Sequence, residues 1–184
     1  MIKQDLFSDL QVQEDACFLC GTHSGITQEH VFAKWMQHGY NLWDKRLTLL
    51  NGTLLQYRNL KIPCCCHCNG VELGRLENLV SNAVGQGYES VKQLGDRPLY
   101  LWAAKIFYGI LRKEWSLLRD RRQPEAGPIV PEEVLRSFSN LHLFLQGSGG
   151  ATISPARLHI PCCSSTSMTL AESIVSASAT ASLT

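Results

Sequence analysis

The chain has 184 residues, of which 45% are hydrophobic and 18% charged, a composition typical of a globular protein with its own core. Its net charge is only +1, so the chain as a whole lacks the basic excess common in nucleic-acid-binding proteins. No apolar run approaches the roughly 18 residues of a membrane span, and the polar N-terminal segment lacks the apolar stretch of a secretory signal. We therefore expect a cytoplasmic protein without a membrane partner, and any nucleic-acid partner has to be argued from local features.

The N-terminal half predicts short strands and turns. Residues 1–14 form a polar lead-in. The β-branched and aromatic residues of 26–36 predict a short strand that runs into a turn or the start of a helix. Alternating apolar and turn-forming residues over 47–62 predict a hairpin, with a type I′ turn at Asn51-Gly52.

The C-terminal half predicts mainly helices. Apolar residues recur at helical spacing over 71–84 and over 98–119, and a shorter helix is expected to start at Pro131. The run LHLFLQ at 141–146 predicts a strand instead. Residues 161–184 are rich in Ser, Thr and Ala and predict a flexible tail without an assigned function.

The longest predicted helix presents a broad apolar surface. We interpret its aromatic residues as core packing and not as a ligand site. The apolar stripe consists of Leu99, Trp102, Ile106, Ile110 and Leu117, with Tyr108 and Trp115 nearby.

Eight cysteines in a chain without a secretory signal favour metal ligation over a disulfide framework. Four of them form two C-x-x-C units with 44 residues between them: Cys17, Cys20, Cys65 and Cys68. Four soft thiolates suit tetrahedral zinc, so these are the predicted ligands. Cys64 and His67 have the same spacing, and a mixed Cys/His site is an open alternative.

The segment between the two units carries a further motif. It reads TQEHVFAKW over residues 27–35, Asn69 follows the second unit at once, and a Leu-Glu pair lies at 76–77. With these pieces, residues 15–80 resemble the HNH endonuclease family, in the branch whose Glu-His segment lies between two C-x-x-C units. The stretch LYLWAAKIFYGILRKEW at 99–115 is similar to the segment after the nuclease core in such proteins, although more loosely.

The resemblance implies an α+β fold with a ββα-metal, treble-clef-like core, in which zinc ties the base of a hairpin to the start of a helix. It implies a nuclease-like zinc domain over 15–88. A mostly helical accessory region is then expected over 89–160.

The resemblance also implies an endonuclease that hydrolyses phosphodiester bonds in DNA. It assigns His30 as the general base, and Glu29 and Asn69 as holders of a catalytic Mg²⁺ or Mn²⁺ ion. The middle asparagine of the family maps to Asn59, with Asn51 as the alternative. An imidazole accepts protons near neutral pH, which suits a base. Successive strand residues face opposite sides, so either the chain bends there, or Glu29 acts on the site from the flank or through water.

Two other interpretations stay open. One is a zinc-binding module that contacts nucleic acid or protein without turnover, since a fold does not by itself determine a function. The other, weaker one is a thiol redox protein.

Glu77 is either a solvated helix-face residue or a supporting residue of the site, while His23 and His38 are interpreted as surface residues. The sequence does not define an oligomeric state.

Overall fold

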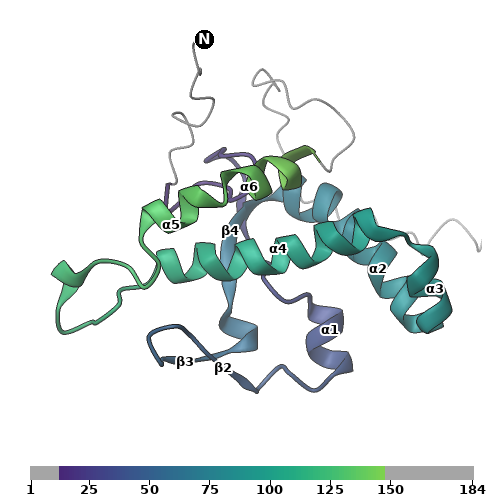
Figure 1. The fold of residues 1–184 in the computed structure, drawn as a ribbon, viewed down its shortest axis with the longest axis horizontal. Helices are drawn as coiled ribbons and strands as arrows, with labels where there is room; N and C mark the ends of the chain where they lie inside the picture. The colour runs from purple at the N-terminus through teal and green to yellow at the C-terminus, as the bar shows by residue number, and fades with distance from the viewer. Residues whose placement is uncertain (1–12, 148–184) are drawn as a thin grey trace, which may run out of the picture.

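The computed structural model describes residues 13–147, and the predicted tail at 161–184 lies outside the described residues. Two small antiparallel sheets and a larger set of helices make up this part of the chain, so the predicted α+β class is confirmed (Figure 1). None of the helices in the described part is both long and apolar enough to cross a membrane.

The first sheet pairs β1 (Ile26–His30) with β4 (Lys61–Cys65). The antiparallel register sets Ile26 opposite Cys65 and His30 opposite Lys61. A two-stranded sheet leaves one edge of each strand unpaired, so β4 tolerates Pro63, which has no N–H to donate. At about 3.3 Å per residue, the cysteine end of β1 and its His30 end lie about 13 Å apart.

The second sheet is the hairpin predicted within 47–62. It pairs β2 (Arg46–Thr48) with β3 (Leu54–Gln56). The predicted two-residue turn is wrong, because residues 49–53 form a longer loop in which Gly52 has φ +83° while Asn51 does not have a positive φ. The Asn51 side chain instead accepts a hydrogen bond from the Thr53 N–H at 3.0 Å, which favours the longer loop.

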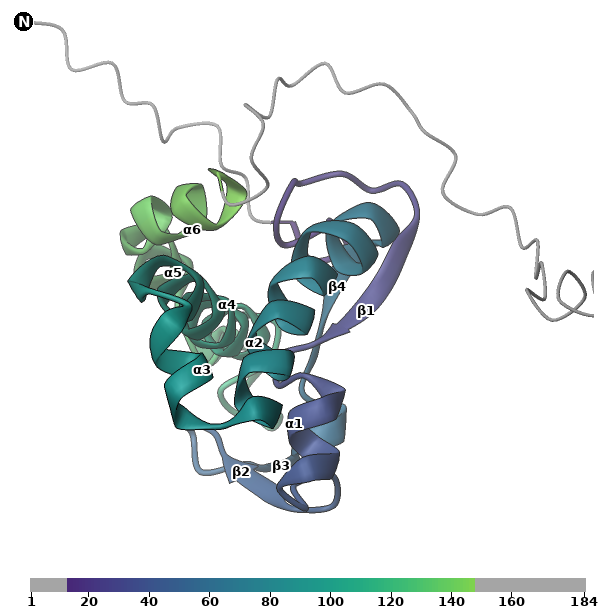
Figure 2. The ribbon, with the colours of Figure 1, turned by 90° about the vertical axis from the view of Figure 1, so that its right-hand side faces the viewer.

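One α-helix lies between β1 and β2, and the other α-helices follow β4. The predicted helices at 71–84 and 98–119 are present with shifted ends, and the first is preceded by a π-helical turn, Cys68–Leu73. The helices are α1 (Lys34–Gly39), α2 (Gly74–Gln86), α3 (Tyr88–Gln93), α4 (Asp96–Trp115), α5 (Glu132–Ser137) and α6 (Ser139–Gln146), with short 3₁₀ turns at Tyr57–Asn59 and Pro124–Ala126. Figure 2 shows the loop before β1 beside the helical turn that follows β4.

The strand predicted at 141–146 is wrong, because this run lies in α6. A short apolar run suits a strand or a buried helix equally well, and packing decides between them. Here Leu141, His142 and Leu145 recur at helical spacing; His142 and Leu145 are buried and Leu141 packs partly against the core.

Helix α4 runs through the middle of the molecule (Figure 1). It contacts the end of β1, where Lys105 donates to the carbonyl of His30. A Cβ atom at Gly109 would lie 3.1 Å from both γ-methyl groups of the buried Val31, so a larger residue here would push against Val31. The predicted apolar stripe of α4 is only partly right, because its members are half-buried. The fully buried face consists of Leu101, Ala104, Lys105, Tyr108, Gly109, Leu111, Arg112 and Glu114.

Candidate functional site

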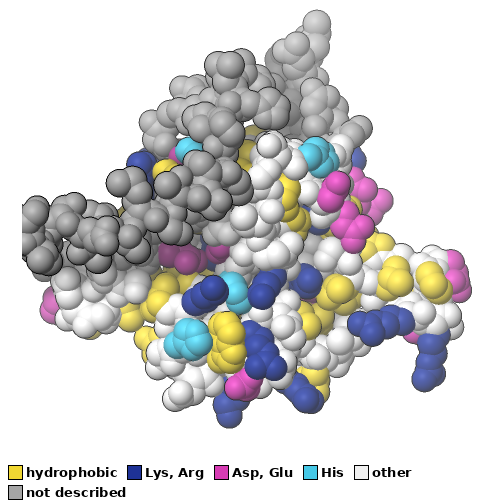
Figure 3. Space-filling model, turned by 180° about the vertical axis from the view of Figure 1, so that it is seen from behind, with side chains coloured by type: hydrophobic (Ala, Val, Ile, Leu, Met, Phe, Trp, Pro, Cys, Tyr) yellow, Lys and Arg dark blue, Asp and Glu magenta, His cyan; other side chains and the backbone are white. Residues whose placement is uncertain are grey.

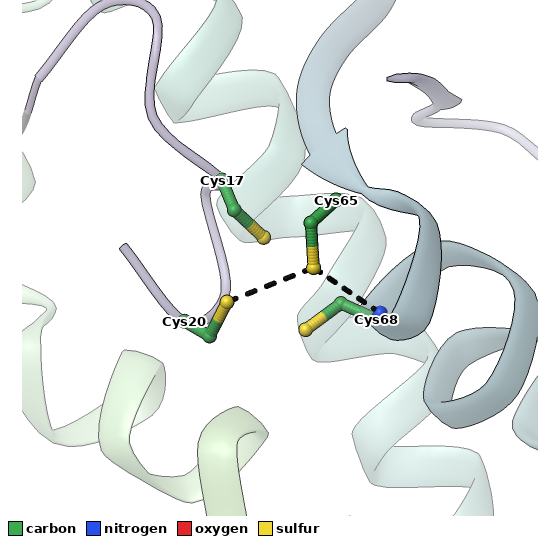
Figure 4. A group of neighbouring side chains, drawn as sticks. All are labelled: Cys17, Cys20, Cys65 and Cys68. Atoms are coloured by element: carbon green, nitrogen blue, oxygen red, sulfur yellow. Dashed lines mark hydrogen bonds between the residues drawn. The ribbon is translucent and has the colours of Figure 1, made fainter. Parts of the chain in front are cut away.

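The four predicted zinc ligands come together at one end of the β1–β4 sheet. Figure 4 shows Cys17 and Cys20 on one loop, facing Cys65 and Cys68 at the end of β4 and on the following helix. Their sulfur atoms all lie within 4.8 Å of one another, and the Sγ atoms of Cys20 and Cys65 are 3.7 Å apart. Tetrahedral zinc with Zn–S bonds of about 2.3 Å requires sulfur separations of about 3.8 Å. The quartet could therefore bind a zinc ion.

Backbone hydrogen bonds shape the loop that carries the first pair. The N–H of Cys17 donates to the carbonyl of Thr22 at 2.8 Å, and the N–H of Gly21 donates to the carbonyl of Cys17 at 2.9 Å. Gly21 has φ +74°, a conformation that glycine adopts without steric cost. The N–H of Phe18 donates to the carbonyl of Pro63 at 2.9 Å, which fastens the loop to β4.

The second pair spans the junction of β4 and the helix. The backbone N–H of Cys68 points at the Sγ atom of Cys65, 3.4 Å away. Such an N–H stabilises negative charge on the sulfur, as a zinc-bound thiolate requires.

Helix α6 adds a support that sequence analysis missed. The ring of His142 contacts the carbonyl of Phe18 through Nε2 at 2.6 Å, and the Gln146 amide donates to the carbonyl of Leu19 at 2.6 Å. Tyr108 stacks on the His142 ring with centroids 4.8 Å apart. Burial lowers the pKa of His142, so the ring is neutral and donates its Nε2–H to the carbonyl. The helical lobe therefore holds the first cysteine loop in place.

The alternative pair, Cys64 and His67, does not join the quartet. Cys64 is fully buried, and its Sγ atom lies 3.9 Å from that of Cys17. Its hydrogen bond to Cys17 and its burial raise the pKa of Cys64, which keeps it a thiol. His67 is half-exposed and contacts Glu72 at 3.3 Å. Cys65, its neighbour on the strand, is the one whose Sγ atom lies within 4.8 Å of those of Cys17, Cys20 and Cys68.

His30 lies at the other end of β1, with 8% of its surface exposed. Its Nδ1 atom is 3.2 Å from the side-chain nitrogen of Gln37 on α1. That nitrogen also donates to the carbonyl of Phe32 at 2.6 Å, which identifies it as the amide donor. Nδ1 therefore accepts, and the neutral ring carries its proton on Nε2. The Trp43 ring lies beside it, with centroids 5.9 Å apart.

The surroundings keep this imidazole neutral. Burial first, and then the charges of Lys61, Lys34 and Lys105, lower the pKa of His30 to about 4. At neutral pH the Nδ1 atom is therefore unprotonated and can accept a proton.

Glu29 points away from His30 and into a buried ion-pair cluster. Its Oε1 atom lies 2.5 Å from Nζ of Lys105 on α4, and Oε1 of Glu77 lies 2.7 Å from the same nitrogen. Lys105 also donates to the carbonyls of His30 at 2.8 Å and Val31 at 3.2 Å. Burial raises the pKa of Glu29, and the ammonium of Lys105 opposes that rise. Glu77 is thus part of this cluster and not merely a solvated helix-face residue.

Lys105 was not among the predicted site residues, although the sequence holds a signal for it. Lys105 lies at helical spacing between the buried residues Leu101 and Tyr108 of α4, and it is 1% exposed. A lysine in that position needs anionic or carbonyl partners, because a lone buried charge is costly.

The predicted ligands of a catalytic ion do not meet in this arrangement. Asn69 donates to Oγ1 of Thr27 at 2.9 Å, three residues before His30. Asn59 is exposed and donates to the side chain of Gln56 at 3.3 Å. Asn51, the alternative, lies in the loop between β2 and β3, and its side chain donates to the carbonyl of Arg119 at 3.0 Å.

Within residues 13–147, the cysteine quartet is the one group of three or more His, Cys, Asp or Glu side chains close enough to hold a metal. The residues present therefore do not fit a shared Mg²⁺ or Mn²⁺ site.

Positive charge is concentrated around His30. Residues 30–61 contain five basic side chains and one acidic side chain, a net +4, whereas the whole chain is +1 and all other residues together are −3. Figure 3 shows Lys, Arg and His side chains gathered over the lower half of one face, where α1 and the β2–β3 hairpin lie. A count of charge in windows along the sequence would have found this concentration, which the total charge hides.

Comparison with known proteins identifies no relative. No protein-family model, no curated protein and no solved structure matches the chain. The resemblance to HNH endonucleases therefore rests on the motif residues alone.

Proposed function

We propose that this protein is an HNH-type endonuclease that hydrolyses phosphodiester bonds in DNA, with His30 as the general base and the cysteine quartet as a structural zinc site. The observation that carries the proposal is a neutral histidine, 8% exposed, that lies opposite Lys61 at the end of β1, within a segment of net charge +4. The order of parts is also consistent with the ββα-metal arrangement, since β1 pairs with β4 and the helix after β4 starts at the quartet.

In the proposed reaction, a water molecule takes the place of the Gln37 amide at Nδ1 of His30. His30 accepts a proton from this water while the water oxygen forms a bond to phosphorus. The P–O bond to the leaving oxygen then breaks, and that oxygen takes a proton from solvent. The ammonium groups of Lys34 and Lys61 offset negative charge on the phosphate. Because the phosphate in turn offsets those charges, substrate binding raises the pKa of His30 toward its ordinary value and makes it a stronger base.

The described residues offer no shared site for a divalent cation beside His30, and the Glu29 carboxylate is engaged by Lys105. The steps above therefore depend only on side chains of the chain itself.

A zinc-binding module without turnover is the second candidate. Two observations favour it: Glu29 is held in an ion pair, and Gln37 occupies the lone pair of Nδ1 on His30. For the mechanism that the resemblance implies, Glu29 would have to leave its ion pair and Gln37 would have to leave the Nδ1 atom of His30.

The decisive test is cleavage of supercoiled plasmid DNA in the presence of Mg²⁺ or Mn²⁺. We expect the wild type to nick the plasmid and His30→Ala to lose activity by a factor of about 10²–10⁴. The matched control is His23→Ala, because His23 is an exposed histidine next to the first cysteine loop. Zinc content and thermal unfolding are measured for all three proteins. No cleavage by a zinc-loaded wild type would leave the binding module as the better candidate.

A further inference from the structure

The basic residues around His30 differ in whether their charge is already neutralised. Arg58 forms an ion pair with Asp44 at 2.5 Å, and Asp44 is the acidic residue of the segment. The other four are Lys34, Lys45, Arg46 and Lys61. Within the described part of the chain, none of these four lies within 4.0 Å of a carboxylate. Lys34, Lys45 and Arg46 are exposed and Lys61 is half-buried.

Two of these residues are placed near His30 by the strand register and by α1, and the other two follow Trp43 in the sequence. Lys61 lies opposite His30 in the β1–β4 register, and Lys34 opens α1 a few residues after His30. The Trp43 ring joins the two sides, since it lies 5.9 Å from the ring of His30 and 4.6 Å from that of His38 on α1. Lys45 and Arg46 come directly after Trp43 and Asp44, at the start of β2.

We propose that Lys34, Lys45, Arg46 and Lys61, which we call the α1–β2 surface, dock the phosphate backbone of double-stranded DNA beside His30. Lysine and arginine contacts to phosphates carry no sequence information by themselves, so the docking is independent of base sequence. The inference rests on the proposed function in one respect: the strand docked here is the one that His30 would cut.

The aromatic residues of this surface favour a duplex over a single strand. Proteins that bind single strands stack successive bases on several exposed rings. Tyr40, 57% exposed, is the strongly exposed aromatic residue between 30 and 61, whereas Trp43 is half-buried between its histidine neighbours. One exposed ring is not a stacking platform, and a duplex presents phosphates without needing one.

Counterion release gives the expected strength of the effect. Each phosphate contact contributes about −0.9 to the slope of log K against log salt, so four contacts give about −3.6. Raising the salt from 50 to 200 mM then weakens binding about 150-fold. Removing one contact reduces the slope to about −2.7 and weakens binding about eightfold at 0.1 M salt.

The test is fluorescence anisotropy with a labelled DNA duplex, without added divalent ions, on the His30→Ala background so that no cutting occurs. We expect Lys34→Gln, Lys45→Gln and Arg46→Gln each to reduce the slope by about 0.9. The matched controls are Arg75→Gln on α2 and Lys92→Gln on α3, both exposed and outside the surface, and these should bind like their parent.

Equal slopes for the surface variants and the controls would overturn the proposal, as would the absence of duplex binding at 50 mM salt. Tighter binding of a single strand or an RNA duplex of the same length would also overturn it. Binding is measured on the His30→Ala background, so its result does not depend on cutting. If these proteins bind DNA as expected while the wild type cuts no plasmid, the docking surface is supported and the nuclease is refuted.

Discussion

Substituting Lys105 by methionine removes the ammonium from the cluster beneath His30 while keeping most of the side-chain volume. The Lys105 nitrogen is 2.5 Å from Glu29, 2.7 Å from Glu77 and within 3.2 Å of two backbone carbonyls. Without it, the carboxylates of Glu29 and Glu77, whose side chains are only 8% and 19% exposed, lose their counter-ion.

Breaking a buried ion pair by removing one partner costs about 3–5 kcal/mol, and Glu77 is exposed enough to recover part of its hydration. We expect Lys105→Met to lower the free energy of unfolding by about 3 kcal/mol. That is a large share of the roughly 5–15 kcal/mol typical of a domain.

The pH dependence has a definite sign. Burial raises the pKa of Glu29, and the variant loses the ammonium that opposes this rise. A carboxyl whose folded pKa is raised binds protons more readily in the folded state, so its protonation stabilises the variant as the pH falls. The penalty of Lys105→Met should therefore be larger at pH 8 than at pH 5.

The assay is urea unfolding of the zinc-loaded proteins, followed by tryptophan fluorescence at both pH values. Glu29→Gln in the Lys105→Met background should recover part of the loss, because it removes a buried unpaired charge, whereas Glu29→Gln alone should destabilise the protein. The double-mutant cycle gives the interaction energy between Lys105 and Glu29. A penalty below about 1 kcal/mol, or the same effect of Glu29→Gln in both backgrounds, would refute this account of the cluster.

Three further predictions concern the zinc site, the packing of α4 and the titration of His30. Cys65→Ser should abolish zinc binding and Cys64→Ala should retain it, measured as zinc per chain; equal loss in both would reject the ligand assignment. Gly109→Ala should lower the free energy of unfolding by about 1–3 kcal/mol, because the added methyl group meets the buried Val31. Adding Val31→Ala should suppress that loss. A Gly109→Ala protein more stable than the wild type would show that the helix propensity of alanine outweighs the contact. The His30 ring should titrate in NMR spectra near pH 4 and not near 6.5. Since the unfolded chain takes up this proton first, stability should fall as the pH drops from about 6.5 toward 4, and a flat profile there would contradict the assigned environment.

Local spacing was enough to predict a cysteine quartet that could bind zinc. In a C-x-x-C unit two thiolates share one turn, so two such units predict a four-sulfur site wherever the fold brings them together. The choice between Cys64 and Cys65 was not available from spacing, because it depends on the strand register that sets Cys65 opposite Ile26. The helices over 74–86 and 96–115 were likewise visible as periodic apolar patterns, to within a few residues at their ends.

Partners distant in sequence were decided by the tertiary structure. Glu29 and His30 are neighbours, yet one contacts α4 and the other α1, because successive strand residues face opposite sides. Lys105 is 75 residues from the His30 carbonyl that it binds, and no local pattern connects them. The segment at 141–146 suited strand or helix until its packing against the rest of the core was known. The sequence by itself determined which groups can bind metal or accept a proton, since that is a property of each side chain and its immediate spacing. Which of those groups share a site was decided only by packing, since burial and long-range contacts determine where each side chain finds its partner.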